Sequence, residues 1–550
     1  MRLPPARLPP ARLPPALLPL RHASFRSLWI AYVITSLGTW LQNTGAGWLM
    51  TSLSPNALTV SLVQAATILP VFLLALPAGA LADIIDRRLF LLGTQVWTML
   101  AAALLAALTL SGQTGVWGLL ALTFAIGIGS AMTNPAWGAV VPELVPREDL
   151  VQAIALNGIG FNLARAVGPA LAGFLVVLAG TGFAFALFAA SILAVITALL
   201  LWRRDGERSV LPREHLLSAI RAGMRFVRNT PAMRAAMMRS FAYSLPASAP
   251  WAVLPLVVRQ QLGLGAGMYG LILGVMGAGG VVAGMSLPAL RKHADRDAVV
   301  AIASLSSCAG MALLALSRHW AVASLGMLLF GLGWVAAFAT LQAAAQLVAP
   351  PWVRARALAI YQLSFNGALA AGSFGWGWLG TRIGLPGALL AAGATGVALV
   401  FLVRGYRISA SATRPAAADA PPIVPEAPAA ELEPLLHTAR GRVMGSMRYQ
   451  VATEDREAFL TAMAEVRRAR GRAGALFWQL YEDVAHPDGW LETWLVESWT
   501  DHLRETSRTS AEDEAVLARA AAFQKDGLPT LARYIAVTPS GPHRAARAVH

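Results

Sequence analysis

Long apolar segments recur through the first 404 residues and restrict what this chain can fold into. Each is about 20 residues long or longer, which lets a helix cross the roughly 30 Å hydrocarbon core of a bilayer. A helix also makes all of its own backbone hydrogen bonds, as a water-free environment requires. We therefore predict an all-α polytopic membrane protein whose twelve membrane-spanning helices form two halves of six, at 28–50, 59–82, 89–110, 116–140, 151–179, 182–202, 237–258, 266–290, 298–316, 321–348, 357–380 and 384–404.

Composition and charge exclude several other classes of protein. Apolar residues make up 56% of the chain and charged residues only 13%, against about 25% charged in a typical soluble domain. The basic side chains form short clusters between the apolar segments, which argues against nucleic-acid binding. Neither Lys292 nor Lys525 lies in a nucleotide-binding Gly-Lys-Ser/Thr motif, so we do not expect an ATP-driven pump. With Cys308 as its one cysteine, the chain has neither a disulfide framework nor a Cys-rich metal site, and we expect no cofactor or metal.

The distribution of basic residues over the loops predicts the orientation. Loops after even-numbered spans hold sixteen Lys and Arg residues, and loops after odd-numbered spans hold three. Because cytoplasmic loops carry the excess of positive charge, both termini are predicted to be cytoplasmic.

Segments of different composition divide the rest of the chain. The Pro- and Arg-rich N-terminus is expected to be disordered. Residues 214–228 space their apolar positions as an amphipathic helix does, either on the inner membrane surface or as a solvated connector. The predicted parts are a disordered extension (1–27), the first half (28–202), a cytoplasmic central loop (203–236), the second half (237–404), an Ala/Pro-rich linker (405–445), a small domain (446–538) and a tail (539–550).

One loop motif and an internal repeat identify a family resemblance. The run Gly79-Ala-Leu-Ala-Asp83-Ile-Ile-Asp86-Arg87-Arg88 resembles the signature loop of the major facilitator superfamily, with Asp86 where glycine is commoner. Phe161-Asn162 and Phe365-Asn366 lie 204 residues apart, as a duplicated six-helix unit would place them. The resemblance implies that Asp83 holds the inner ends of the two halves together. The inner gate that it implies comprises Gly79, Asp83, Arg87, Arg88, Arg354 and Arg356.

Further motifs narrow the resemblance to one branch. Pro146-Arg147, the run from Asn162 to Gly173 and Trp352-Val-Arg354-Ala-Arg356 are similar to the transmembrane secretion-effector branch, which includes an enterobactin exporter. This implies a carrier in the cytoplasmic membrane that exports a small organic compound, such as a siderophore or drug-like molecule, by alternating access. An uptake carrier for a small anionic nutrient is the alternative. Proton coupling is expected from the family, although no acidic residue lies inside the predicted spans.

Arg165 is the most informative residue inside a predicted span. It lies near the bilayer centre, where a guanidinium facing lipid would cost about 2.5–3.5 kcal/mol or more, so it should face the bundle or a water-filled cavity. It either binds an anionic or catechol-like substrate or serves as a structural hydrogen-bond hub. The predicted substrate pathway comprises Arg165, Asn162, Gln42, Asn43, Asn134 and Asn366.

Other residues in the spans have simpler interpretations. Trp48, Trp97, Trp117 and Trp251 are interpreted as anchors at the membrane interface. The glycines at 274, 277, 280 and 284 indicate close helix packing.

The C-terminal segment has the pattern of a small soluble domain. Strands are predicted at Val443–Val451, Ala475–Tyr481, Leu491–Glu497 and Arg533–Thr538, and helices at Arg456–Arg470 and Glu512–Gln524. This order gives a ferredoxin-like α+β domain that resembles antibiotic-biosynthesis monooxygenases. Trp499 and His502 are its candidate site, against the alternative of a packed aromatic and a solvated histidine. The domain is either an oxygenase anchored by the membrane part or a dimerisation module.

Overall fold

A computed structural model describes most of the chain and divides it into two compact units. The helical unit comprises Met1–Arg213, Ala235–Gln346 and Leu358–Ser409, and the tail unit comprises Glu214–Arg234, Leu347–Ala357 and Ala410–His550. Within these bounds the described residues are 15–84, 86–202, 216–350, 353–408, 442–509, 511–525, 527 and 529–536.

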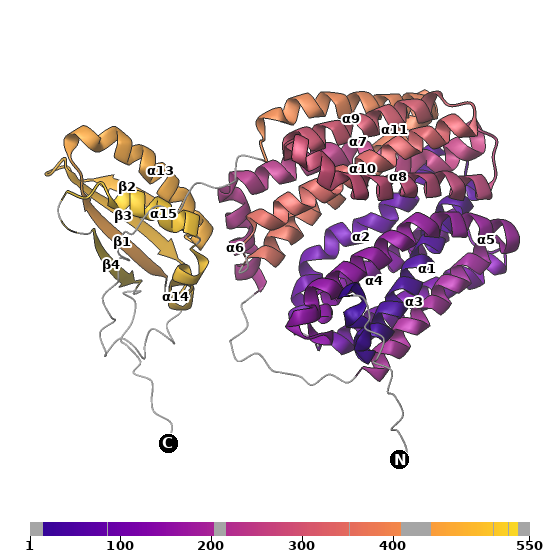
Figure 1. Ribbon diagram of the computed structural model, residues 1–550, viewed down its shortest axis with the longest axis horizontal. Helices are drawn as coiled ribbons and strands as arrows, with labels where there is room; N and C mark the ends of the chain where they lie inside the picture. Colours follow the sequence, from indigo (N-terminus) through magenta and orange to yellow (C-terminus); the bar gives the residue numbers. More distant parts are fainter. Residues whose placement is uncertain are drawn as a thin grey trace, which may run out of the picture. The chain divides into compact units, whose positions relative to one another are not determined.

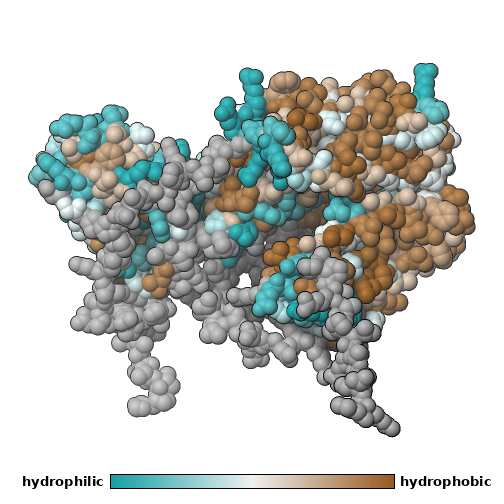
Figure 2. Space-filling model, in the orientation of Figure 1, coloured by the Kyte–Doolittle hydropathy of each residue, from teal (hydrophilic) through white to brown (hydrophobic). Residues whose placement is uncertain are grey.

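Long apolar helices build the helical unit (Figure 1). They are α1 (Ala23–Leu53), α2 (Ala57–Ile84), α3 (Arg87–Leu110), α4 (Val116–Leu144), α5 (Leu150–Leu201), α7 (Pro231–Leu256), α8 (Ala266–His293), α9 (Arg296–Leu316), α10 (Trp320–Val348) and α11 (Arg354–Leu402). Nine helices in the described ranges are long and apolar enough to cross a membrane. Large apolar side chains lie exposed on the outside of this unit, as Figure 2 shows, which suits contact with lipid.

Two helices are about twice as long as one membrane crossing needs, and each is broken by a glycine. α5 has 52 residues with Gly180 at φ 81° and ψ 170°, and α11 has 49 residues with Gly384 at φ 78° and ψ 165°. These left-handed φ values interrupt the helix and favour glycine, which has no Cβ. The breaks fall between the predicted spans 151–179 and 182–202, and at the boundary of 357–380 and 384–404.

The N-terminal residues are more ordered than the sequence led us to expect. A disordered extension over 1–27 is wrong for residues 15–27, because a 3₁₀ helix, η1 (Pro15–Arg21), precedes α1. Asp149 Oδ2 lies 3.0 Å from Arg21 Nη2 and 2.9 Å from His22 Nε2. The hydrogen bond with His22, together with the Arg21 charge, holds the pKa of Asp149 below its usual range. This ionised carboxylate fixes η1 beside the start of α5.

A four-stranded sheet with helices forms most of the described tail unit. Its elements are α6 (Leu216–Asn229), β1 (Val443–Gln450), α13 (Arg456–Ala473), β2 (Phe477–Glu482), β3 (Gly489–Val496), α14 (Trp499–Arg508), α15 (Ala511–Ala521) and β4 (Thr530–Ile535). The strand order is β2-β3-β1-β4, and each neighbouring pair is antiparallel. α14 was not predicted. The amphipathic helix expected near 214–228 is present as α6, and it packs against α13, a contact that neither expected setting included.

Replacing Gly180 by alanine should lower the thermal stability of the purified protein. The left-handed backbone disfavours a Cβ by about 1–2 kcal/mol, and no neighbouring atom lies within 4 Å to complicate the effect. Gly375→Ala is the matched control, because Gly375 is helical and also has open space around its Cβ position. We expect a lower apparent melting temperature for Gly180→Ala and an unchanged or higher one for Gly375→Ala. Equal melting temperatures for the two variants would contradict a role for Gly180 in the turn.

Candidate functional site

A cavity of about 230 Å³ lies inside the helical unit. Helices from both sequence halves contribute to its wall: α1, α2, α5, α7, α8, α10 and α11. Its polar lining residues are Asn43, Thr44, Gln64, Thr67 and Arg165, and its other lining residues are Trp40, Phe161, Pro250, Trp251, Leu254, Tyr269, Leu273, Met327, Trp334 and Leu369. A mostly apolar cavity with a few convergent polar groups is the usual form of a small-molecule site.

Arg165 supplies the one charged side chain among these lining residues. Its Nη2 atom is buried and makes no hydrogen bond to any residue that the structure describes. A buried donor without a partner costs free energy, so a ligand acceptor in the cavity would stabilise this side chain. The structure therefore places Arg165 at a cavity, as its depth in the membrane predicted.

Close packing of α5 against α8 positions Arg165. A Cβ at Gly277 would lie 3.0 Å from the carbonyl oxygen of Arg165, and a Cβ at Gly280 would lie 3.2 Å from its Nη2. Gly274 also packs tightly, with a Cβ position 3.2 Å from the side chain of Ala170, whereas Gly284 has open space around it. The glycine stripe of α8 thus acts as a packing surface, with the exception of Gly284.

Tryptophans form much of the remaining wall. The ring centroids of Trp40 and Trp251 lie 6.3 Å apart, and those of Trp251 and Trp334 lie 5.5 Å apart in an edge-on arrangement. The interpretation of Trp251 as an interface anchor is therefore wrong, because its ring faces other aromatic rings at the cavity. Trp334 was missed in the sequence, although its place in the middle of α10 distinguishes it from anchors, which lie near helix ends.

The predicted amide side chains have different surroundings. Asn43 lines the cavity. Gln42 precedes Asn43 in the sequence and is buried, but it is not among the lining residues. Its Nε2 has no hydrogen-bond partner among the described residues. Asn162 and Asn366 each donate to a carbonyl one turn back in their own helix, at 2.9 Å, and Asn134 is exposed. The structure thus brings Asn43 to the cavity with Arg165 and leaves Asn162, Asn366 and Asn134 out of its lining.

The residues of the predicted inner gate are only partly described. Gly79 and Asp83 lie in α2, and the side chain of Asp83 lies outside the described part. Arg87 Nη1 donates to Glu143 Oε1 at 2.6 Å, and Arg88 donates to the carbonyls of Leu199 and Leu200 at the end of α5.

Two of the remaining motif residues, Asp86 and Arg354, also have assigned contacts. Asp86 caps α3 by accepting from the backbone N–H groups of Arg88 and Leu89 at 3.0 and 3.1 Å, which explains an aspartate where the family motif commonly has glycine. Arg354 is exposed and donates to the carbonyl of Ala349, and Arg356 is half-buried.

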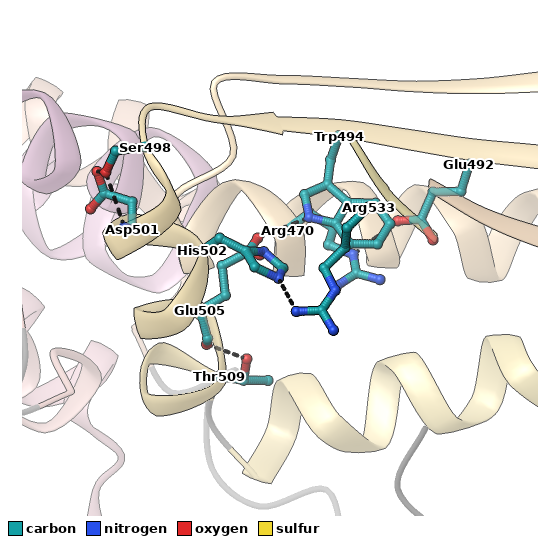
Figure 3. Close-up of polar contacts among 9 residues, drawn as sticks. All are labelled: Arg470, Glu492, Trp494, Ser498, Asp501, His502, Glu505, Thr509 and Arg533. Carbon is teal, nitrogen blue, oxygen red and sulfur yellow. Dashed lines mark hydrogen bonds and ion pairs between the residues drawn. The ribbon is translucent and has the colours of Figure 1, made fainter. Parts of the chain in front are cut away.

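Of the two candidate tail residues, His502 belongs to a cluster of polar contacts that includes residues of α14 (Figure 3). The Trp499 side chain is buried, and the His502 ring lies 5.3 Å from it. His502 Nδ1 lies 2.6 Å from Glu505 Oε2, and only 11% of its side chain is exposed. The alternative of a solvated His502 is therefore wrong.

A second buried carboxylate, Glu492, organises the centre of the tail domain. It accepts from Arg470 Nε at 2.9 Å, from Tyr449 Oη at 3.0 Å and from Trp478 Nε1 at 3.0 Å. Burial alone would lower the pKa of Arg470, but Glu492 outweighs it and the pKa lies above its ordinary value. Burial, followed by Glu492, raises the pKa of Tyr449 well above its ordinary value. The cluster is an ion pair with satisfied partners, which is the arrangement of a structural element. Across the described ranges, no three His, Cys, Asp or Glu residues lie together in a way that could hold a metal ion.

Removing the Glu492 charge should destabilise the sheet of the tail domain. Glu492→Gln keeps the shape of the side chain but leaves the Arg470 charge without its counter-ion, and breaking a buried pair costs about 3–5 kcal/mol. Hydrogen exchange in strands β1 and β3 of the full-length protein should become faster. Glu482→Gln is the control, because its pair with Arg456 is exposed and should contribute only about 0–1 kcal/mol. Similar exchange in both variants would show that Glu492 does not stabilise the sheet.

Comparisons with known proteins connect this architecture to carriers. The staphyloferrin A transporter of Staphylococcus aureus is 30% identical over 138 residues, which are 25% of this chain and 35% of that protein. Macrolide efflux protein A of Streptococcus pyogenes is 24% identical over 28% of this chain and 37% of its own length. The chain thus spans about a third of the length of these two relatives. The Enterobactin exporter EntS of Escherichia coli is 22% identical over 58% of this chain and 76% of the exporter.

Solved structures and a family match complete the comparison. The nucleoside transporter NupG (D323A mutant) is similar with a TM-score of 0.58 and 12% identity, over 70% of this chain and 99% of that one. A bacterial homologue of the iron transporter ferroportin has a TM-score of 0.53 and 16% identity, over 69% of this chain and 98% of the homologue. These likenesses show a shared transporter fold. Residues 15–539 match the transmembrane secretion effector family, and the chain therefore belongs to this family of major facilitator transporters.

Proposed function

We propose that the protein is a secondary active carrier that exports a small organic compound across the cytoplasmic membrane by alternating access. One observation carries the proposal: the buried, unpartnered Nη2 of Arg165 lies at a cavity lined by helices of both sequence halves. A site between two halves can be opened to either side as the halves rock against each other. The exporters among the relatives support the outward direction; uptake of a small anionic nutrient through the same cavity is the alternative.

The proposed carrier has twelve membrane spans. Nine helices qualify by length and composition, the breaks at Gly180 and Gly384 divide two of them, and α1 adds one more. Sixteen basic residues in the loops after even-numbered spans, against three in the others, support cytoplasmic termini. In this arrangement Asp83, Arg87, Arg88, Arg354 and Arg356 belong to the inner gate, and proton coupling proceeds through Asp83 or the substrate.

The proposed substrate carries an anionic group beside a ring or another apolar body. A guanidinium can bind a carboxylate or catecholate through two parallel hydrogen bonds. Indole rings next to it provide faces for an aromatic or apolar body. The staphyloferrin A transporter and the enterobactin exporter, both named for siderophores, support this class. The macrolide efflux protein supports the broader class of drug-like compounds.

For the tail we propose a ferredoxin-like α+β domain that serves as a dimerisation module. The Phe477 and Tyr481 side chains of edge strand β2 are 53% and 48% exposed, and an exposed apolar edge suits pairing with another copy. An oxygenase related to antibiotic-biosynthesis monooxygenases is the alternative. His502 is paired with Glu505, and Glu492 is paired with Arg470. These internal pairs favour the module over the enzyme.

Substitution of Arg165 should separate substrate binding from structural support. The test is the affinity of purified protein for 2,3-dihydroxybenzoate, which carries a carboxylate and a catechol, compared with uncharged catechol. Arg165→Gln should weaken dihydroxybenzoate binding by about 1.5–3 kcal/mol, roughly ten- to a hundredfold, because a hydrogen bond to a charged group is lost. Arg165→Lys keeps the charge but not the planar fork, so its affinity for dihydroxybenzoate should lie between those of the wild type and Arg165→Gln.

Arg318→Gln is the control for Arg165, because Arg318 is exposed in a loop away from the cavity lining. It should leave both affinities unchanged. Unchanged dihydroxybenzoate affinity in Arg165→Gln, with reduced thermal stability, would leave Arg165 a packing role only and overturn the proposal for the site.

A further inference from the structure

A second hollow lies entirely within the tail unit and is separate from the cavity at Arg165. This groove has a volume of about 620 Å³. One wall is the segment 228–234, where α6 ends and α7 begins, and the other wall is formed by α13, β2 and β3. Its volume is that of a site for a small organic molecule.

Contacts between the central loop and the tail domain hold the two walls together. Arg472 Nη1 donates to the carbonyl of Asn229 at 3.3 Å, and Arg472 Nε donates to Asp513 at 2.8 Å. Gly471 leaves room for Asn229, since a Cβ there would lie 2.6 Å from its Nδ2. Further back in α6, Arg221 Nη1 lies 3.5 Å from Glu497 Oε1. The groove is thus a built feature of the tail unit.

The charge of the groove is strongly one-sided. Four arginines line it, two from each wall: Arg228, Arg234, Arg467 and Arg468. No acidic side chain is among its lining residues, and the guanidinium groups of these four arginines make no hydrogen bond or ion pair with a residue that the structure describes. Positive charges gathered around a concave surface raise the local concentration of anions.

The wall formed by α13, β2 and β3 adds an apolar contact surface. Trp478 and Trp490 are lining residues, together with Leu460 and Met463. The Trp478 Nε1 atom is already bound to Glu492, so this side chain offers a ligand its ring face. Four guanidinium groups and apolar or aromatic side chains lining one groove suit an anion that also carries an apolar body.

We propose that this groove binds a phosphate-bearing organic anion with an apolar portion, either the headgroup of an acidic phospholipid or a soluble metabolite of the same chemistry. Guanidinium groups bind phosphate through paired hydrogen bonds, and the four arginines provide this from two directions. Because the ligand would contact both walls, its binding fastens the central loop, which connects the two halves of the carrier, to the tail domain. The site therefore gives the carrier a point at which a cytoplasmic anion can act on the loop between its halves.

The test measures binding of the trisulfonated dye pyranine to the full-length protein in neutral detergent, by fluorescence anisotropy. We expect saturable binding that weakens as salt rises. The double variants Arg228→Gln/Arg234→Gln and Arg467→Gln/Arg468→Gln, each affecting one wall, should weaken binding by about tenfold or more, since each removes two charge-assisted contacts. Arg442→Gln/Arg448→Gln is the matched control in the same domain; both residues are exposed and neither lines the groove, so binding should stay within about twofold.

Competition distinguishes the two sources of the anion. Displacement by short-chain phosphatidylglycerol but not phosphatidylcholine supports the lipid headgroup, and displacement by inorganic pyrophosphate without phosphatidylglycerol supports a soluble metabolite. Hydrogen exchange of the tail strands confirms that the variants remain folded. Absence of pyranine binding, or equal binding by the control and both folded double variants, overturns the proposal.

Discussion

The packing of the helical unit around Arg165 depends on how the charge of this side chain is accommodated inside an apolar span. A guanidinium facing lipid is costly, and no acidic residue in the predicted spans can neutralise it. The structure gives this side chain a cavity bordered by tryptophan rings and uncharged polar groups. Glycines 277 and 280 let α8 approach closely enough to support it. The cavity at this one charge lies between helices of the two halves, which is the feature a carrier needs.

The tail unit accommodates a buried arginine in the opposite way. Arg470 has a carboxylate, Glu492, at 2.9 Å, and that carboxylate has two further donors. A fully paired charge in a low-dielectric interior is stable without a ligand, whereas Arg165 keeps a free donor. The same side chain is therefore structural in one unit and suited to binding in the other. The four groove arginines resemble Arg165 in lacking partners, but water can reach them.

Sequence patterns predicted much of the fold because hydropathy and strand alternation are local properties. The breaks at Gly180 and Gly384 and the strands β1 to β3 agree with the expected boundaries within a few residues. Contacts between distant segments were not predictable in this way: Trp251 looks like an anchor until α10 brings Trp334 beside it, and η1 is fixed by Asp149, more than 120 residues away. Arg165 was found because charge inside an apolar span is itself a local signal. The aromatic wall around it depends on how seven helices meet.

Transport in inverted membrane vesicles tests the central claim most directly, because export then becomes uptake into the vesicle lumen. Vesicles with the wild-type protein, energised by a proton gradient, should accumulate a radiolabelled catecholate siderophore or macrolide above the level of vesicles without it. Vesicles with Arg165→Gln at equal protein abundance should accumulate the compound no faster than empty vesicles. Equal accumulation by the wild type and Arg165→Gln would contradict the role of the cavity, and no accumulation of any compound tested would contradict the export function.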